Sequence, residues 1–406
     1  MNYRKPNILI VSFIILCSTS FYNLKALGPA QKAVPLLGVG IVIGLLILHL
    51  VYGNHHQIKH QYSIFIAFIF ISFFTSMIMA NYDRDQTIPQ SLFAQRALFY
   101  YLFYFLLHQM RIRPRDLEWI IISFGILHGV LFILQYLAYP TILFNTFIII
   151  GRGTIRIYLP GSDYLAICFF MSIMAFLRTN KPKYLLYMLL SFSVFVLLGG
   201  RQTMALMAFV LLLAVFFSRK VKSRLGITVL IGAGILLVFI LFQSIFQGMM
   251  VESKSNTAQG FGYVRIRAAQ YFLTDFYKST IAYIAGNGVP FGSSSYGKMI
   301  ESLKISQGFY LADIGILGSY ITFGIFFLIG VFGMIFKTLR SKFDNNYLYI
   351  KFVFIGFLLS LATGSGFGNA DFICSLCCLL YIIDVSQPEA SSDNISRESF
   401  NQSDDS

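Results

Sequence analysis

The chain has 406 residues, of which 57% are hydrophobic and only 12% are charged, and its mean hydropathy is +0.71. These values lie outside the range of soluble globular domains and predict an all-α integral membrane protein. The formal net charge of +14 does not indicate a nucleic-acid-binding protein. The basic residues gather in short connections between apolar runs, where membrane topology accounts for them.

The apolar runs, taken in chain order, predict a polytopic bundle of about twelve transmembrane helices, because a span needs about 20 predominantly apolar residues. The first run has the length of a signal peptide, but no small-residue cleavage site follows it, so we interpret it as a retained span. The run at 92–108 is the weakest, because it carries Arg96. The expected spans are 8–22, 34–52, 63–80, 92–108, 117–136, 158–177, 184–198, 203–217, 225–246, 314–336, 348–365 and 369–384.

The connections alternate in basicity, and this alternation predicts the orientation. Short connections rich in lysine and arginine face the cytoplasm in membrane proteins. We therefore expect both termini in the cytoplasm and connections 23–33, 81–91 and 137–157 on the outer face. The basic residues assigned to the cytoplasmic side are Arg4, Lys5, Lys59, Arg111, Arg113, Arg115, Arg178, Lys181, Lys183, Arg219, Lys220, Lys222, Arg224, Lys337, Arg340 and Lys342.

This orientation divides the chain into four parts. Residues 1–246 are expected to hold about nine transmembrane helices, and residues 314–385 about three more. Between them, residues 247–313 form a long loop on the outer face, and loops of this length are usually functional or disordered. Apolar and aromatic residues in the loop argue against disorder. The Ser- and Asp-rich end, 386–406, is predicted to be a disordered cytoplasmic tail.

A five-residue break at 199–203, Gly-Gly-Arg-Gln-Thr, separates the apolar runs 184–198 and 204–217. No soluble loop intervenes, so Arg201 is expected at or just inside the outer membrane face. A cation at that depth costs about 3 kcal/mol on insertion scales, and it tends to face a cavity or a ligand. Arg201 is therefore a candidate functional residue.

The periodicity of residues 264–284 predicts an amphipathic helix in the long loop. Arg265 shares a stripe with apolar and aromatic residues, so we expect it to face the membrane domain. Arg267 and Tyr271 lie on a second, more polar stripe, where solvation is better. A Gly-Asn-Gly-Val-Pro turn signal follows at 286–290.

The sequence predicts no metal, cofactor or disulfide chemistry. All five cysteines lie in apolar runs, and we interpret the Cys374-x-x-Cys377 pair as small-residue helix packing. The histidines are expected on the cytoplasmic side or, for His128, within a span, where packing or solvation accounts for them. Motifs of metalloproteases, serine hydrolases and P-loop enzymes do not occur.

Lysine and arginine are enriched in the cytoplasmic connections of membrane proteins, so arginines predicted on the outer side need a separate explanation. Arg152 and Arg156 precede a predicted span, Arg201 lies in the break, and Arg265 and Arg267 lie in the loop. Arginine presents a planar fork of donors that matches phosphate, so an anionic ligand such as a pyrophosphate-linked lipid would explain them. The alternative is that these side chains extend to lipid headgroups.

The order of these elements resembles the bacterial O-antigen polymerase and O-antigen ligase superfamily, over about residues 150–320 and in topology. In that family a span ends in a Ser-Arg-Gly-like break, which stands here around Arg201. A periplasmic loop follows two spans later, with an arginine before an aromatic helix, matched here by Arg265 or Arg267. Its Gly-x-Gly turn corresponds to Gly286-Asn-Gly288.

Two further motifs extend the resemblance, and two departures qualify it. Asp313 precedes Ile-Gly-Ile-Leu-Gly, where the family has an acidic or polar residue before Gly-Ile-Leu-Gly, and Arg156 precedes a Pro-containing span start. However, Gly200 and Gln202 replace the serine and glycine that flank the family arginine. The ligase branch also carries a histidine near the end of the loop, and residues 306–310 (Ser-Gln-Gly-Phe-Tyr) hold none.

The resemblance implies a metal-independent, cofactor-free glycosyltransferase of the bacterial inner membrane. It would polymerise O-antigen, capsule or exopolysaccharide repeat units carried on undecaprenyl diphosphate, in contact with membrane lipids and with a chain-length regulator or flippase as partner. The missing histidine disfavours the alternative of a ligase that transfers glycan to lipid A-core. A polysaccharide transporter or flippase is the other alternative, and such folds usually show internal repeats, which we do not find here.

We expect Arg201 and one of the two loop arginines to neutralise the charge that develops on the diphosphate leaving group. Asp313 is the nearest candidate base, although it is equally suited to capping the helix that follows. The predicted catalytic residues are therefore Arg201, Arg265 and Asp313. The predicted substrate-binding residues are Arg267, Arg156, Arg152, Tyr271, Gly286, Gly288 and Glu301.

Overall fold

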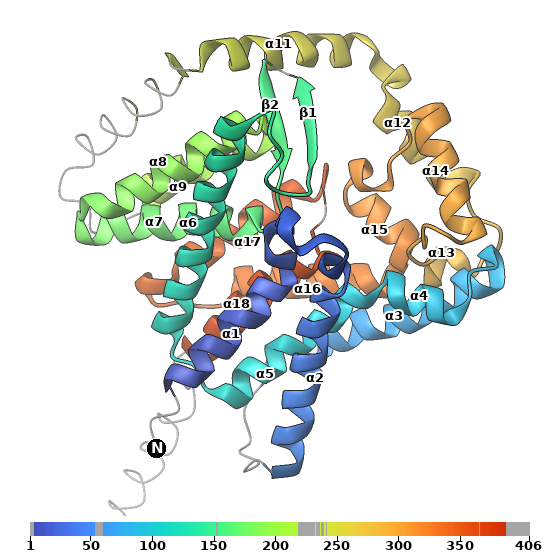
Figure 1. Cartoon of the computed structure of the whole chain (residues 1–406), viewed down its shortest axis with the longest axis horizontal. Helices are drawn as coiled ribbons and strands as arrows, with labels where there is room; N and C mark the ends of the chain where they lie inside the picture. The colour runs from blue at the N-terminus through green and yellow to red at the C-terminus, as the bar shows by residue number, and fades with distance from the viewer. Residues whose placement is uncertain are drawn as a thin grey trace, which may run out of the picture.

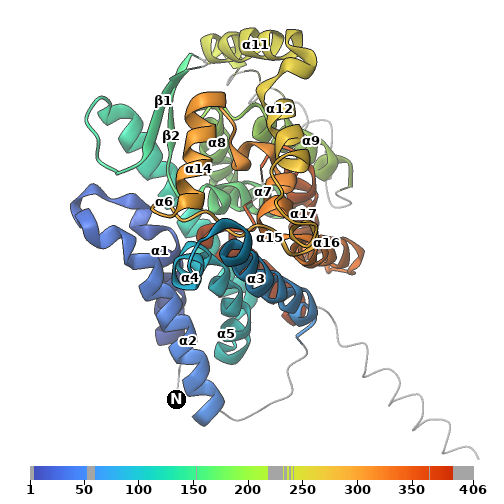
Figure 2. The ribbon, with the colours of Figure 1, turned by 90° about the vertical axis from the view of Figure 1, so that its right-hand side faces the viewer.

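The computed structural model describes residues 4–52, 60–151, 153–217, 242–364 and 366–386, together with residues 232, 236, 239 and 240. The chain is mostly helical, as its composition predicts. Figures 1 and 2 both place helix α2 (Val34–Tyr52) at one end of the molecule and helix α11 (Gln243–Ala258) at the other.

The first half of the chain forms α1 (Arg4–Ser18), η1 (Ser20–Asn23), η2 (Lys25–Lys32), α2, α3 (Ser63–Arg84), α4 (Ile88–Ala94), η3 (Arg96–Leu102), α5 (Phe103–Met110), α6 (Pro114–Ala138), α7 (Ser162–Thr179), α8 (Pro182–Leu197) and α9 (Arg201–Phe217). The long-loop region holds α11, η4 (Gly260–Gly262), α12 (Val264–Thr274), α13 (Ala282–Ala285), α14 (Ser295–Gln307) and η5 (Leu311–Ile314). The chain ends with α15 (Ile316–Phe323), α16 (Ile325–Arg340), η6 (Asn345–Tyr347), α17 (Tyr349–Ser360) and α18 (Ala370–Ser386).

Four helices of the described residues, α2, α3, α6 and α7, are long and apolar enough to cross a membrane. The prediction of about twelve spans is therefore wrong for this structure. Several expected spans are shorter apolar helices, namely Pro6–Ser18, Pro182–Leu197, Arg201–Leu213 and Tyr349–Ser360. The expected span at 225–246 lies mostly outside the described residues, and so does the expected tail beyond Ser386.

Tertiary contacts break some of the apolar runs. The run at 314–336 is divided at Gly324, which adopts a φ of +79° and joins α15 to α16. A Cβ at this position would lie 2.2 Å from the carbonyl oxygen of Ile284, so the loop chain passes directly over the break. The weakest expected span, 92–108, is likewise divided among the end of α4, η3 and α5.

A β-hairpin occupies part of the connection predicted at 137–157. Strands β1 (Phe147–Gly151) and β2 (Thr154–Tyr158) pair antiparallel, with Ile149 opposite Arg156. Figures 1 and 2 show the hairpin extending toward α11. At its turn, a Cβ on Gly153 would lie 2.9 Å from the carbonyl oxygen of Ser244, so the hairpin and the start of α11 are in close contact.

The long-loop region shares a separate hydrophobic core with α15. Helix α12 ends at Thr274, ten residues before the end of the predicted amphipathic helix at 264–284. The predicted apolar stripe is confirmed only in part, because Phe272 and Phe276 are 0% and 2% exposed whereas Tyr283 is 36% exposed. Full burial of one such side chain contributes about 2–3 kcal/mol. The core comprises Ala268, Phe272, Phe276, Tyr296, Ile300, Phe309, Ile314 and Ile321.

Candidate functional site

The predicted break is confirmed as the interruption between two helices, and it places Arg201 at the first turn of α9. Helix α8 ends at Leu197, and Gly199 adopts a φ of +68°, which costs glycine no steric strain. The N-terminus of a helix carries a partial positive charge and unpaired N–H groups. A guanidinium at this point therefore adds to a local field that attracts anions.

Arg201 reaches from this helix start to the long-loop region. Its Nη1 donates to the carbonyl oxygen of Met249 (3.2 Å), and its Nη2 lies 3.4 Å from Oε1 of Glu252. The Arg201 side chain remains 28% exposed. It lines a cavity of about 470 Å³, which we call the arginine cavity, together with Ser253, Asn256, Thr257, Tyr263 and Ile266.

The two loop arginines lie beside this cavity without lining it. Ile266, which lies between them in the sequence, lines the cavity. Arg265 is instead paired with Asp313, with its Nη2 3.8 Å from the Asp313 Oδ1. The two residues of this pair are 36% and 50% exposed, so it contributes little to stability. The Arg267 guanidinium lies 5.7 Å from the ring centroid of Phe309. Arg265 is thus paired near the start of α15, and Arg267 is held against the loop core.

Arg156 connects the hairpin to the break. It lies on β2, where its Nε donates to the carbonyl oxygen of Leu198 (3.1 Å) and its guanidinium lies 5.2 Å from the ring centroid of Tyr158. The hairpin therefore packs beside the residues that precede Arg201. Arg152 lies outside the described residues.

The remaining predicted substrate-binding side chains lie apart from the arginine cavity. Tyr271 contacts the rings of Phe272 and Phe309, at centroid distances of 5.5 and 5.7 Å, in the loop core. Glu301 lies on an exposed face of α14 and pairs with Lys304 at 2.9 Å. The structure thus places Arg201 near the start of α12. Tyr271 and Glu301 lie elsewhere, in the loop core and on the exposed face of α14.

The predicted Gly286–Gly288 turn packs against membrane-domain backbone. Gly286 and Gly288 have φ values of +80° and +75°, and the amides of Asn287 and Gly288 donate to the carbonyl oxygens of Ile321 (2.9 Å) and Thr322 (2.7 Å) at the end of α15. Between them, the Asn287 Oδ1 accepts bonds from Arg84 Nε (3.3 Å) and Nη2 (2.9 Å). Arg84 also donates to the carbonyl of Phe276 and is 5% exposed. Arg84 was not among the site residues predicted from the sequence, because it lies at the end of an apolar run and belongs to no motif.

A second cavity adjoins the break on the side of the membrane helices. It measures about 410 Å³, and we call it the aspartate cavity. Its lining includes Asp163, Gln202, Thr203, Ser360, Asn369 and Phe372. Asp163 was not among the site residues predicted from the sequence. The signal for a role was present: Asp163 and Asp371 both fall in the first turn of helices expected to begin at the outer face.

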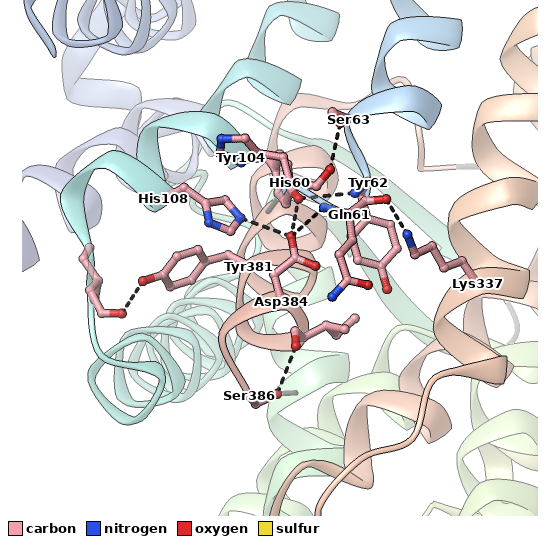
Figure 3. Close-up of polar contacts among 12 residues, drawn as sticks. His60, Gln61, Tyr62, Ser63, Tyr104, His108, Lys337, Tyr381, Asp384 and Ser386 are labelled. Carbon is pink, nitrogen blue, oxygen red and sulfur yellow. Dashed lines mark hydrogen bonds and ion pairs between the residues drawn. The ribbon is translucent and has the colours of Figure 1, made fainter. Parts of the chain in front are cut away.

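A polar cluster lies at the other end of α18, centred on Asp384 (Figure 3). Asp384 accepts a hydrogen bond from the Tyr104 hydroxyl, and its Oδ2 lies 3.2 Å from His108 Nε2. The His60 and His108 rings pack edge-on at a centroid distance of 4.6 Å. Burial lowers the pKa of His60 and nearby His108 lowers it further, whereas Asp384 acts in the opposite direction. The cluster joins α18 to α5 and to the start of α3.

No protein-family model matches the chain, and no curated protein matches it either. The resemblance drawn from the motifs therefore remains a proposal. Within the part of the chain that the structure describes, no group of three or more His, Cys, Asp or Glu residues is placed to hold a metal ion.

Proposed function

We propose that this chain is a membrane polymerase of lipid-linked oligosaccharide repeat units, of the O-antigen, capsule or exopolysaccharide type. It transfers a growing glycan from undecaprenyl diphosphate to a hydroxyl of an acceptor sugar at the outer face of a bacterial inner membrane. In this proposal both termini lie in the cytoplasm, and the long-loop region covers the site from the periplasm.

The observation that carries the proposal is the position of Arg201. Its guanidinium stands at a helix N-terminus, beside a cavity of about 470 Å³, in contact with α11. Two independent sources of positive potential thus act on one space. A diphosphate linked to a polyprenyl chain would present its anionic groups at this depth, with the lipid in the membrane and the glycan toward the loop.

The proposed mechanism follows from this electrostatic arrangement. As the bond between the anomeric carbon and the phosphate oxygen breaks, negative charge develops on the diphosphate, and a preorganised guanidinium stabilises it. Glu252 now lies 3.4 Å from Arg201, so a bound diphosphate replaces this carboxylate as the anionic partner. Arg265 supplies a second cation, because its half-exposed 3.8 Å pair with Asp313 is readily exchanged.

The proposal predicts that Arg201→Ala abolishes chain extension while the protein still inserts. Loss of one charge-stabilising donor typically lowers the rate by about 10²–10³-fold, so cells should accumulate carriers with a single repeat. Glycan length on polyacrylamide gels measures the effect, with membrane abundance measured by immunoblot.

Arg178→Ala is the matched control, because Arg178 is an exposed arginine at the end of α7 that pairs with Asn346. This variant should make polymer of normal length. Normal-length polysaccharide in the Arg201→Ala strain, at normal protein abundance, contradicts the proposed function. Normal polymer that fails to reach lipid A-core would instead indicate the ligase.

A further inference from the structure

The aspartate cavity has the features of a small saccharide site. It lies among α7, α9, α17 and α18, helices from two separate stretches of the sequence. Its volume of about 410 Å³ falls in the range of ligand-binding pockets, which combine apolar walls with a few convergent polar groups. Aromatic walls come from Phe170, Phe195, Phe357 and Phe372.

The polar groups of this cavity are those that bind sugar hydroxyls. Asp163 offers a carboxylate, Gln202 and Asn369 offer amides, and Ser360 and Thr203 offer hydroxyls. Carboxylates accept hydrogen bonds from hydroxyls, and amides both donate and accept them. The cavity presents one carboxylate and no arginine or lysine among its lining residues. A neutral polyol therefore suits it better than a phosphate.

Asp371, which is not among the residues that line the cavity, holds the segment before Asp163 in place. The Asp371 Oδ2 accepts the Gly161 amide at 2.7 Å, which ties the segment just before Asp163 to the start of α18. Its Oδ1 accepts the Phe372 amide at 3.0 Å. Each of the two carboxyl groups lies in the first turn of its helix, Asp163 in α7 and Asp371 in α18.

Residues of the break line both this cavity and the arginine cavity. Arg201 lines the arginine cavity, and the next two residues, Gln202 and Thr203, line the aspartate cavity. A donor held by its diphosphate at Arg201 is therefore one residue along α9 from a sugar held in the aspartate cavity. Such adjacency is the requirement for bringing an acceptor hydroxyl to an anomeric carbon.

We propose that the aspartate cavity binds the acceptor sugar of the lipid-linked repeat unit, and that Asp163 accepts the proton of the attacking hydroxyl. This inference rests on the proposed function. The hydroxyl oxygen forms the new bond to the donor's anomeric carbon, the bond from that carbon to the phosphate oxygen breaks, and the diphosphate leaves with the electron pair. The hydroxyl proton passes to the Asp163 carboxylate, and Asp371 is a positioning residue.

This assignment moves the base from Asp313, the residue favoured by sequence, to Asp163. Asp313 is 50% exposed and pairs with Arg265, whereas its neighbour Ala312 is the residue that lines the aspartate cavity. A base must lie within hydrogen-bond reach of the proton that it removes. Asp163 meets this requirement for a sugar in the cavity.

The test uses the purified full-length chain and a synthetic undecaprenyl-diphosphate repeat unit as the only substrate. Asp163→Asn should lower kcat about a hundredfold or more and remove the acidic limb of the pH–rate profile. Asp371→Asn should lower kcat less and displace that limb, with KM little changed. Asp344→Asn, at an exposed aspartate before η6, is the matched control and should match the wild type.

Ser360→Phe provides a second measurement that leaves both carboxylates intact. Ser360 lines the cavity at the end of α17, so a phenyl ring there should raise the KM for the repeat unit about tenfold or more. The Ser360→Phe variant therefore still tests the inference if Asp163→Asn does not fold. An unchanged KM in Ser360→Phe, or a folded Asp163→Asn that behaves like Asp344→Asn, overturns the inference. If Arg201→Ala is inactive in the same assay, the proposed function survives that result; if Arg201→Ala is active too, both fail.

Discussion

At the scale of single residues, Arg84 shows how a buried cation anchors the long-loop region to the membrane helices. Its guanidinium donates to Asn287 Oδ1 and to the carbonyl of Phe276, and it lies 4.1 Å from the Phe276 ring centroid and 5.5 Å from that of Tyr296. Hydrogen bonds from charged donors and stacking on aromatic faces are each worth more when desolvated. Arg84 therefore holds the segment that follows α12 and the Gly286–Gly288 turn against the end of α3.

Arg84→Ala is expected to destabilise the protein by about 2–3 kcal/mol, because the Asn287 and Phe276 oxygens lose a charged donor in a buried site. Thermal unfolding of the detergent-solubilised protein measures the change. Arg113→Ala serves as the control, since Arg113 is 59% exposed and pairs only within its own helix turn with Asp116. Its effect should stay within about 0.5 kcal/mol. Equal melting temperatures for the two variants would refute the anchoring role.

At the scale of elements, two glycines allow the loop region to cross the junction of α15 and α16. A Cβ on Gly286 would lie 2.5 Å from the Phe323 carbonyl carbon, and one on Gly324 would lie 2.2 Å from the Ile284 carbonyl oxygen. Both glycines have positive φ values. The turn that was predicted to bind substrate is therefore a packing contact between backbones in this structure.

Gly286→Ala should lower the free energy of unfolding by more than about 1 kcal/mol, because alanine is strained at a positive φ and its Cβ would clash with the neighbouring backbone. Limited proteolysis of the loop region should show faster cleavage, with unfolding temperature as a second measure. Gly40→Ala is the matched control, because a Cβ on that helical glycine meets nothing within 4 Å. Cleavage of Gly286→Ala at the rate of the control would show that the close approach is unimportant.

At the scale of the whole molecule, composition and local patterns predicted the helical class, the break before Arg201 and the burial of Phe272 and Phe276. These features depend on neighbours within one or two helical turns. The number of spans could not be predicted from the sequence, because an apolar run forms two helices where a distant segment packs across it. At Gly324 that segment is Ile284, 40 residues earlier along the chain.

The candidate site was predictable to a similar extent. Arg201 was identified because an arginine between apolar runs is costly in a membrane. Asp163 and Asp371 were not identified together, because 208 residues separate them and only the fold brings the starts of α7 and α18 side by side. Arg84 was missed for the same reason, since its partner Asn287 lies 203 residues away.

The measurement that tests the central claim most directly is polymerisation by the purified full-length chain, with an undecaprenyl-diphosphate repeat unit as sole substrate. Mass spectrometry and gel electrophoresis read the product. The account predicts a ladder of two, three and more repeats on one carrier with release of undecaprenyl diphosphate, and no ladder with Arg201→Ala. Folded wild-type protein that leaves the repeat unit unextended, or an Arg201→Ala variant that extends it at the wild-type rate, would contradict the account.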